Sequence, residues 1–174
     1  MKGFCSLFLT IISLLSCGQD MSSLPAKTIY SAYVKDSFEI YINAPKGADT
    51  MKQLSVIYYM DANLRSGKKL REMIDKPEFS AKAGKTIFVG VGHMSDFHVL
   101  RRRDFILPSI NGNDTTGSSA NYGQTENFYR FLQKELVPMI NGMYHTNPDN
   151  NSILGHSLGG LFAFYFLFKN EPPF

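Results

Sequence analysis

A serine flanked by glycines is the part of this sequence best suited to chemistry. The stretch ILGHSLGGLFAFYFLF, residues 153–168, places Ser157 between a short apolar strand and an apolar helix, within the pattern Gly-x-Ser-x-Gly. Such a turn, a nucleophile elbow, exposes the hydroxyl on a strained backbone while the glycines let strand and helix approach closely. The pattern alone arises in about one chain in twenty of this length. With this context it predicts a catalytic Ser157; the alternative is a glycine-bounded turn with an idle serine.

A serine hydroxyl is a poor nucleophile unless a base removes its proton. After Ser157 the sequence has one acid, Glu171, and no histidine. We expect His156 to pack beside the sheet and His145 to lie at the sheet edge opposite the serine. Four further candidates follow a buried strand: His93, Asp96, His98 and Asp104. A rearranged triad from these four, or a zinc site from His93, Asp96 and His98, is conceivable, but we favour loop residues near the substrate mouth and expect no metal.

The apolar runs predict an α/β protein with a mainly parallel sheet. The expected strands are the alternating stretch from Ser37, the buried runs Leu54–Met60 and Thr86–Val91, and the short Ser152–Leu154. The expected helices are Lys68–Lys76, a stretch from about Thr125 to Ile140, and the apolar run Leu161–Phe168, with an irregular segment over His93–Gly117 and turns at Asn43–Gly47 and Asn147–Asn150. Ligands bind beyond the carboxyl ends of parallel strands. The loops after Met60 and Val91 should therefore meet Ser157 at one edge.

The N-terminus is typical of an export signal. Lys2 is followed by an apolar run, Phe4–Leu15, that is too short to span a bilayer comfortably. The run ends in Leu-Leu-Ser-Cys17, which resembles a bacterial lipobox, so we expect cleavage before Cys17 and its lipid modification. The alternative is an ordinary secretory signal with an incidental cysteine.

This reading divides the chain into a lipoprotein signal peptide, residues 1–16, a polar tether, residues 17–27, and an α/β domain, residues 28–174. The expected location is the bacterial cell envelope. The protein would be exported and lipid-anchored to a membrane, facing the periplasm or lying on the outer membrane.

Composition excludes several other classes of protein. A net charge of +3, with 44% apolar and 19% charged residues, is ordinary for a packed globular domain. The basic run Arg101–Arg103 is followed by Asp104 and an apolar stretch, unlike a nucleic-acid footprint. Cys5 and Cys17 are the only cysteines, so the expected domain has no thiol for a disulfide, a metal or a nucleophile. We expect no cofactor and no nucleic-acid partner.

Several stretches beyond the elbow resemble one family. YINAPKG, SVIYYMDAN, RRRDF and ENFYRFLQKELVPMINGMYHTNP, followed by SILGHSLGGLFAFY, are similar to the esterase D-like, siderophore-esterase-like family of the α/β-hydrolase superfamily. Its members include siderophore esterases, feruloyl esterases and mycolyltransferases. The resemblance runs from about Ser37 to Phe168. It implies an α/β-hydrolase-type, mainly parallel sheet with flanking helices, incomplete here and reaching through the nucleophile elbow.

The resemblance also implies site residues. Ser157 would be the nucleophile, and the backbone N–H of Leu158 would be one donor of the oxyanion hole. The second donor would come from the loop after Met60, either Ala62 or Asn63. The family usually has glycine where this chain has Ala62, and alanine disfavours positive φ. The choice between the two donors therefore stays open.

The superfamily carries its partners in the order serine, acid, histidine, and two of the three have no counterpart here. We therefore expect a C-terminally truncated fragment with low activity. We also expect low solubility, because the helix Leu161–Phe168 is apolar all round and the strand before Ser157 becomes a sheet edge.

The predicted function is a serine hydrolase that acts on carboxylic ester bonds of a small molecule, such as a siderophore or acyl ester. Two alternatives stay open. One is a non-catalytic envelope lipoprotein with a hydrolase-like fold. The other is an acyltransferase, which uses the same elbow with an alcohol in place of water.

Overall fold

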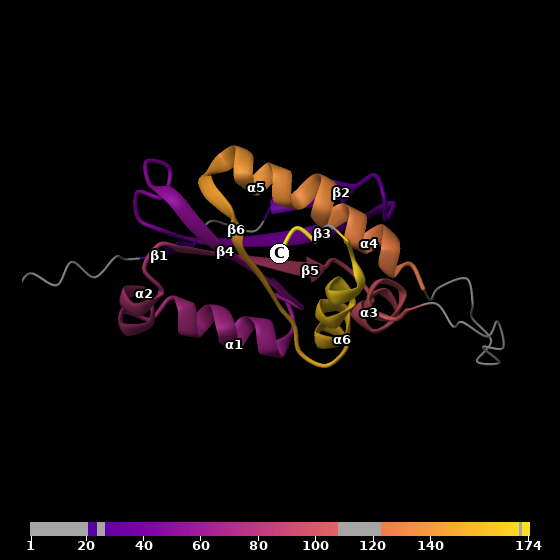
Figure 1. Ribbon diagram of the computed structural model, residues 1–174. Coiled ribbons are helices and arrows are strands. Elements are labelled where there is room, and N and C mark those ends of the chain that lie inside the picture. The colour runs from indigo at the N-terminus through magenta and orange to yellow at the C-terminus, as the bar shows by residue number, and fades with distance from the viewer. Residues whose placement is uncertain (1–20, 24–26, 108–122, 171) are drawn as a thin grey trace, which may run out of the picture.

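A six-stranded mixed sheet forms the centre of the protein (Figure 1). The structure, a computed structural model, describes residues 21–23, 27–107, 123–170 and 172–174. The strands are β1 (Met21–Ser23), β2 (Lys27–Ser31), β3 (Asp36–Pro45), β4 (Lys52–Met60), β5 (Thr86–His93) and β6 (His145–Leu154). The expected signal peptide and Cys17 lie outside the described residues, so the lipid anchor stays a prediction.

The strand order is β1-β3-β5-β4-β6, with β2 also paired to β3. Strand β4 lies between β5 and β6 and is parallel to both, which confirms the expected α/β-hydrolase-type core. The N-terminal strands β1 and β2 pair antiparallel with β3, and β3 pairs antiparallel with β5. The carboxyl ends of β4, β5 and β6 therefore meet at one edge of the sheet, where ligands bind in open α/β sheets.

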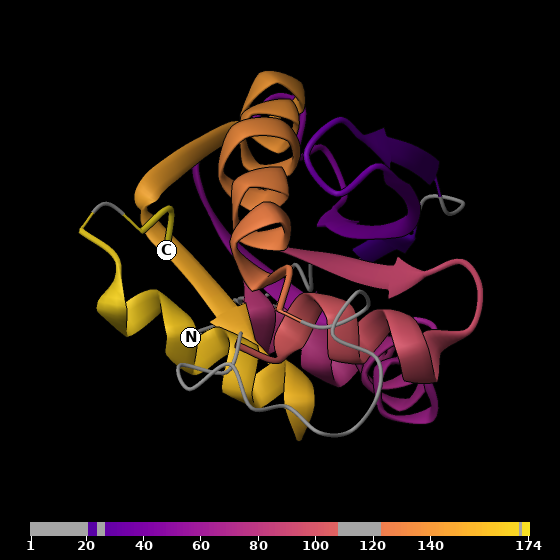
Figure 2. The ribbon, with the colours of Figure 1, turned by 90° about the vertical axis from the view of Figure 1, so that its right-hand side faces the viewer.

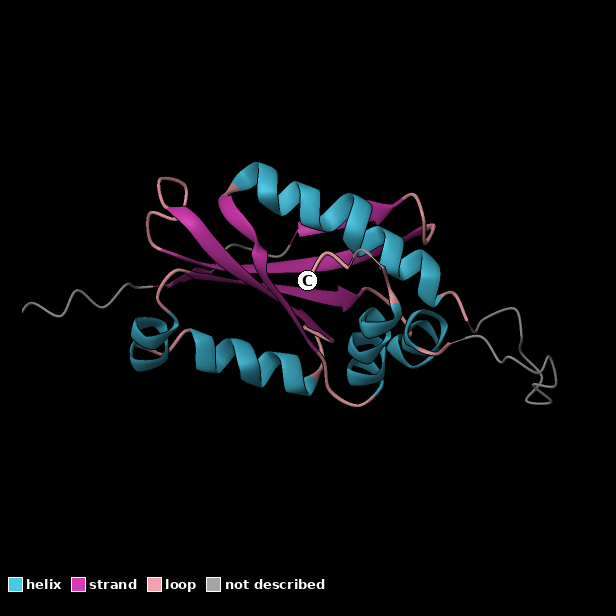
Figure 3. Cartoon of the chain, viewed as in Figure 1, coloured by secondary structure: helices cyan, strands magenta, loops and turns pink. Residues whose placement is uncertain are grey.

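Helices cover both faces of this sheet (Figures 1 and 3). They are α1 (Arg65–Ile74), α2 (Pro77–Ala83), α3 (Phe97–Phe105), α4 (Thr125–Phe131), α5 (Val137–Met143) and α6 (Leu158–Tyr165), with a π-helical turn η2 (Leu132–Leu136) between α4 and α5 and a 3-10 turn η3 (Phe166–Phe168) after α6. Strand β5 is buried from Ile87 to His93, as a strand covered on both faces should be. None of the helices in the described part of the chain is both long enough and apolar enough to cross a bilayer.

Two apolar cores lie on the two sides of the sheet. The smaller joins Tyr59 and Phe88 of the sheet to Ile74 of α1, with Leu70 and Phe79 packed against it. The larger is rich in aromatic rings and joins the sheet to α3, α4, η2, α5, α6 and η3. Helix α6 therefore belongs to the larger core, and Figure 2 shows it beside the strand that leads into it.

The structure differs from the sequence-based expectation in three places. Helix α3 forms inside the segment expected to be irregular, because it buries Asp104 and Phe105 although three arginines interrupt its apolar stripe. Strand β6 begins at His145, and the expected turn, residues 147–150, is a bulge within it, since Thr146 and Asn151 both face β4. Strands β1 and β2 take up part of the expected tether and pair with β3.

Helix α6 and the turn after it have one buried and one exposed side. Phe162 is fully buried, with ring centroids 5.4 Å from Phe105 and 5.0 Å from Phe128. Apolar side chains are exposed on the other side: Leu161, Phe164, Leu167 and Phe168. The helix is thus held to the body of the protein mainly through one face.

This difference predicts unequal effects for two phenylalanines of the same helix. Phe162→Ala should lower the free energy of unfolding by about 3–5 kcal/mol, because it leaves a cavity among buried rings. Phe164→Ala, at a position that is 55% exposed, should change it by less than about 0.5 kcal/mol. Urea denaturation followed by circular dichroism measures both. Equal losses for the two variants would contradict the packing described for α6.

Candidate active site

The turn from β6 into α6 has the backbone of a nucleophile elbow. Ser157 adopts φ 56° and ψ −121°, a conformation that costs a residue with a side chain roughly 1–3 kcal/mol. The residue is exposed and directly precedes the first residue of α6. The predicted strained and exposed serine is therefore present in the structure.

Glycines make this turn sterically possible. A Cβ atom on Gly155 would overlap the carbonyl group of Gly159. A Cβ atom on Gly159 would lie 3.1 Å from Cβ of Met60 and 3.2 Å from Oδ2 of Asp61. Strand β6, helix α6 and the end of β4 therefore approach one another more closely than larger residues would allow.

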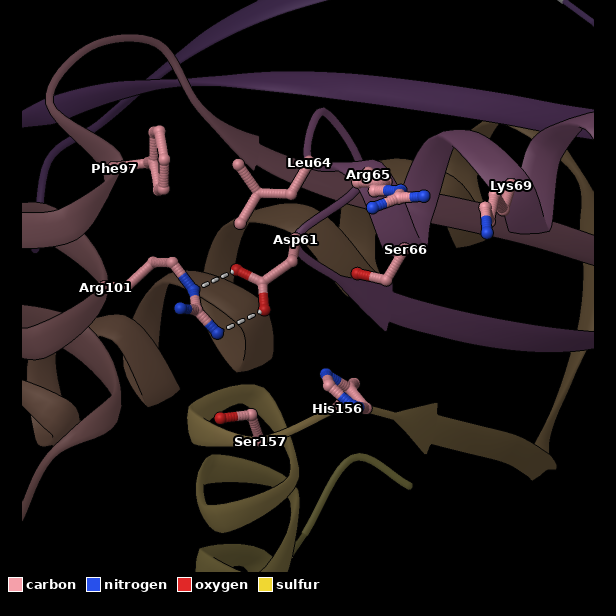
Figure 4. A pocket seen from close by; sticks show the side chains of 9 residues that line it. All are labelled: Asp61, Leu64, Arg65, Ser66, Lys69, Phe97, Arg101, His156 and Ser157. Carbon is pink, nitrogen blue, oxygen red and sulfur yellow. Dashed lines mark hydrogen bonds and ion pairs between the residues drawn. The ribbon is translucent and has the colours of Figure 1, made fainter.

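Ser157 opens into a cleft of about 550 Å³ at the carboxyl edge of the sheet (Figure 4). Helix α1 supplies Arg65 and Lys69 to its lining, and α3 supplies Phe97 and Arg101. The remaining lining includes Asp61, Leu64, Ser66 and His156. The loops after β4 and β5 thus meet the serine at one edge, as the sequence predicted.

An ion pair spans the cleft beside the serine (Figure 4). Arg101 donates two hydrogen bonds to Asp61, from Nε to Oδ1 at 2.6 Å and from Nη2 to Oδ2 at 2.8 Å. Asp61 is the first residue after β4, has φ 60° and is almost fully buried. This two-pronged pair fixes α3 against the end of β4, and it neutralises the one carboxylate in the cleft.

The structure distinguishes the two candidates for the second oxyanion donor. The N–H of Ala62 donates to the carbonyl oxygen of Val91 at 3.0 Å and is therefore engaged. No hydrogen bond from the backbone N–H of Leu158 or Asn63 is found within the described ranges. The positive φ lies at Asp61 and not at Ala62, so the alanine is tolerated. Leu158 and Asn63 are the donors that this geometry favours, and their role stays a prediction.

The histidine that ends β5, His93, and the one in α3, His98, take no part in the cleft. His93 is buried, and its Nε2 lies 2.9 Å from Oδ2 of Asp104. Arg103 donates to both oxygens of Asp104 and also to Asp36 at 2.9 Å. His98 is exposed on α3, with its ring 4.0 Å from that of Phe97. Neither His93 nor His98 lines the cleft with Ser157, so a rearranged triad is not assembled.

The zinc site that was weighed as an alternative is not assembled either. Within the described part of the chain, no group of three His, Cys, Asp or Glu residues is placed to hold a metal ion. His93 instead bonds the buried carboxylate of Asp104 and packs against the rings of Phe38 and Phe105.

Two other histidines lie at opposite ends of β6. His145 begins the strand, far along it from Ser157, as expected. His156 was expected to pack beside the sheet, and this expectation was wrong. The residue is exposed and lines the cleft, because the elbow turns it away from the sheet toward Ser66 of α1.

Several residues of the cleft were not identified from the sequence. Arg101 was treated as part of a basic run, although it is the partner of Asp61. Arg65 and Lys69 were not predicted to line the site, although they lie four residues apart at the start of the helix that follows the predicted oxyanion loop. This spacing places both on one helix face and was the one available signal.

A polar cluster fixes the C-terminal end of α6. Glu126 of α4 accepts hydrogen bonds from Lys169 and from the hydroxyl of Tyr165. Burial alone would raise the pKa of Glu126, but the bonds from Lys169 and Tyr165 outweigh it and lower the pKa. For Lys169 the signs are reversed. Burial alone would lower its pKa, but the hydrogen bond to Glu126 outweighs burial and raises the pKa. The charged forms of both residues are therefore favoured in the folded protein.

The strain at Ser157 predicts an increase in stability when the residue becomes glycine. Ser157→Gly should raise the free energy of unfolding by about 1 kcal/mol relative to Ser157→Ala, because glycine adopts positive φ freely and alanine does not. Urea denaturation of the two variants measures the difference. An equal or lower stability of the glycine variant would show that the backbone at Ser157 is unstrained.

The polar cluster predicts a pH-dependent loss of stability. Glu126→Gln should lower the free energy of unfolding at pH 7 by up to about 1 kcal/mol. A carboxylate with a lowered pKa stabilises the fold above its unfolded pKa, and this contribution disappears as the pH falls through the folded pKa. The difference from the parent protein should therefore shrink between pH 7 and pH 3 in urea denaturation. Glu72→Gln, at an exposed position of α1, is the control, and an unchanged difference at pH 3 would contradict the assignment.

Comparison with known proteins confirms the resemblance. The chain matches the family described as "Putative esterase" over residues 31–174. It is 28% identical over 146 residues to the ferri-bacillibactin esterase BesA of Bacillus subtilis (strain 168), a match that covers 79% of this chain and 50% of that protein.

Solved structures agree with this match. The BES protein from Bacillus cereus superposes with a TM-score of 0.68 at 25% identity, over 97% of this chain and 61% of that one. An IroE-like serine hydrolase from Shewanella oneidensis gives 0.62 at 28% identity, over 88% and 48%. The chain thus spans about half the length of the curated relative. Since the family match covers most of the chain, including the elbow, the protein belongs to this α/β-hydrolase family of esterases.

Proposed function

We propose that this chain carries the nucleophile of a serine hydrolase acting on carboxylic esters. The observation that carries the proposal is the conformation of Ser157, which is strained, exposed and open to the cleft. A serine with no chemical role gives no reason to keep such a backbone, whereas a nucleophile must stand clear of the sheet.

The geometry supports acyl transfer through a tetrahedral intermediate. The Oγ atom of Ser157 would attack the ester carbonyl, and the carbonyl oxygen would gain negative charge. The N–H groups of Leu158 and Asn63 are the proposed donors to that oxygen, each worth about 3 kcal/mol in the transition state. The start of α6 adds the positive end of its dipole beside the serine. This arrangement stabilises charge that develops only during the reaction.

The reaction also needs a base that removes the proton of Ser157. Residues 158–174 contain no histidine, so the base for Ser157 must come from another segment. The superfamily order places an acid and then a histidine after the serine. We propose that the same order applies to this protein.

The substrate class follows from the relatives. BesA is named as an esterase of ferri-bacillibactin, so we propose a siderophore-type ester as the substrate of this protein. The predicted lipid at Cys17 would hold such an esterase at the cell envelope. This location rests on the sequence alone.

A chromogenic short-chain ester tests the serine assignment. Residues 1–174 alone should turn it over weakly, because a serine without a base is a poor nucleophile. In a form that carries an acid and a histidine after Ser157, Ser157→Ala should lower kcat about 1,000-fold or more. Ser152→Ala, at an exposed position of β6 outside the cleft, should change kcat little. Full turnover by the Ser157→Ala variant of that form would refute the proposal.

A further inference from the structure

The cleft that holds Ser157 carries a positive charge that the protein itself does not neutralise. Three cationic side chains line it, Arg65, Lys69 and Arg101, against the single carboxylate of Asp61. Asp61 is bound to Arg101 by two hydrogen bonds. Within the described part of the chain, neither Arg65 nor Lys69 forms an ion pair. Two cations at the cleft are thus left for a ligand.

Both free cations come from the same face of α1. Arg65 and Lys69 lie four residues apart and therefore project on one side of the helix. Figure 4 shows both across the cleft from Ser157, and Ser66 of α1 lies on the side of the helix toward the elbow. Lys68, an equally exposed lysine of α1, does not line the cleft. The placement at the cleft is therefore particular to these two positions and is not shared by all cations of the helix.

The charge of the whole protein is concentrated on the layer that carries this pair. Residues 65–85 contain seven Lys or Arg and three Asp or Glu, a net charge of +4, whereas the whole chain has +3. The rest of the chain therefore carries −1. A cleft beside a layer with a net positive charge raises the local concentration of negatively charged ligands and speeds their association.

We infer that Arg65 and Lys69 are specificity-determining residues, which make the cleft prefer esters whose acid or alcohol part carries negative charge. This inference rests on the proposed function, because it assigns the charge of the substrate of that site. The two cations bind the anionic group of the ligand at a distance from the reacting carbonyl, so they act on substrate affinity and not on the chemical step. Carboxylate, phosphate and catecholate groups all present oxygen anions to such a pair.

The alternative interpretation is that Arg65 and Lys69 belong to a solvated helix face, where most surface cations lie. The two readings differ in what they predict for matched ligands. A solvated face gives no preference between a charged and a neutral ligand of equal length. If Arg65 and Lys69 form a cationic rim of the cleft, the protein prefers the charged ligand. This preference should disappear when Arg65 and Lys69 are replaced, persist when Lys68 is replaced, and weaken as the salt concentration rises.

The test measures binding, so it does not depend on turnover. The ligands are two amides of one aromatic amine that resist hydrolysis, succinic acid monoanilide, which ends in a carboxylate, and butyric anilide, which ends in a methyl group. Dissociation constants are measured by NMR titration at 20 and 300 mM salt. The protein should bind the carboxylate ligand more tightly at low salt.

Arg65→Gln and Lys69→Gln should each weaken binding of the carboxylate ligand about 2- to 5-fold, and the double variant about 10-fold. Binding of butyric anilide should not change. Lys68→Gln is the matched control and should behave like the parent protein. Equal denaturation midpoints of all variants show that the fold is intact, as expected for exposed positions.

Three results would overturn the inference: no preference for the carboxylate ligand in the parent protein, equal weakening of both ligands, or an equal effect of Lys68→Gln. Ser157→Ala should bind both ligands as the parent does. If Ser157 proves to have no role in turnover while the charge preference persists, the proposed function fails and the inference about Arg65 and Lys69 stands. If turnover depends on Ser157 and the charge preference is absent, the inference about Arg65 and Lys69 fails and the proposed function stands.

Discussion

The close approach of β6 and α6 is the constraint on which the site depends. The chain must leave β6, the strand at one edge of the sheet, and start a helix within three residues, and the carbonyl of Gly159 occupies the space that a side chain on Gly155 would need. The residue between them is forced to positive φ, and this conformation turns the hydroxyl of Ser157 out of the sheet. Among the residues that the structure describes, the same reversal leaves the N–H of Leu158 at the start of α6 without a carbonyl partner. The proposed nucleophile and the proposed oxyanion donor are thus two results of one backbone reversal.

The neighbouring strand ends in a similar way. Asp61 follows β4 with φ 60°, and its carboxylate lies close to Gly159 at the start of α6. Each of these two residues costs roughly 1–3 kcal/mol of conformational strain. Helix α3 provides compensation at both central strand ends, because Arg101 holds Asp61 and the Asp104 carboxylate holds His93 at the end of β5. Helix α3, with three arginines in its sequence, thus fixes the ends of β4 and β5 at the edge of the sheet where Ser157 lies.

How far the sequence predicts this structure depends on the range of each interaction. The elbow is local, since glycine spacing and an apolar helix decide it, and it was predicted with its serine. The parallel core also follows from apolar runs that only buried strands carry. The Arg101–Asp61 pair joins residues 40 positions apart, and no pattern near either residue reveals the other. Helix α3 was missed for the same reason, because its buried residues, Asp104 and Phe105, pack against side chains of other elements. The turn residues 147–150 predicted a reversal, but pairing with β4 continues on both sides of them, so the chain bulges without turning back.

The two faces of the sheet serve different requirements. On the face of α4 and α6, buried rings such as Phe128 and Phe162 pack the helix that follows Ser157 against the body of the protein. On the face of α1 the core is small, and its cations lie outside that core. Exposed positions such as Arg65 and Lys69 can change at little cost to folding. Substitutions at these two positions can therefore alter the charge that lines the cleft and leave the packing of α6 unchanged, because α1 and α6 belong to different cores.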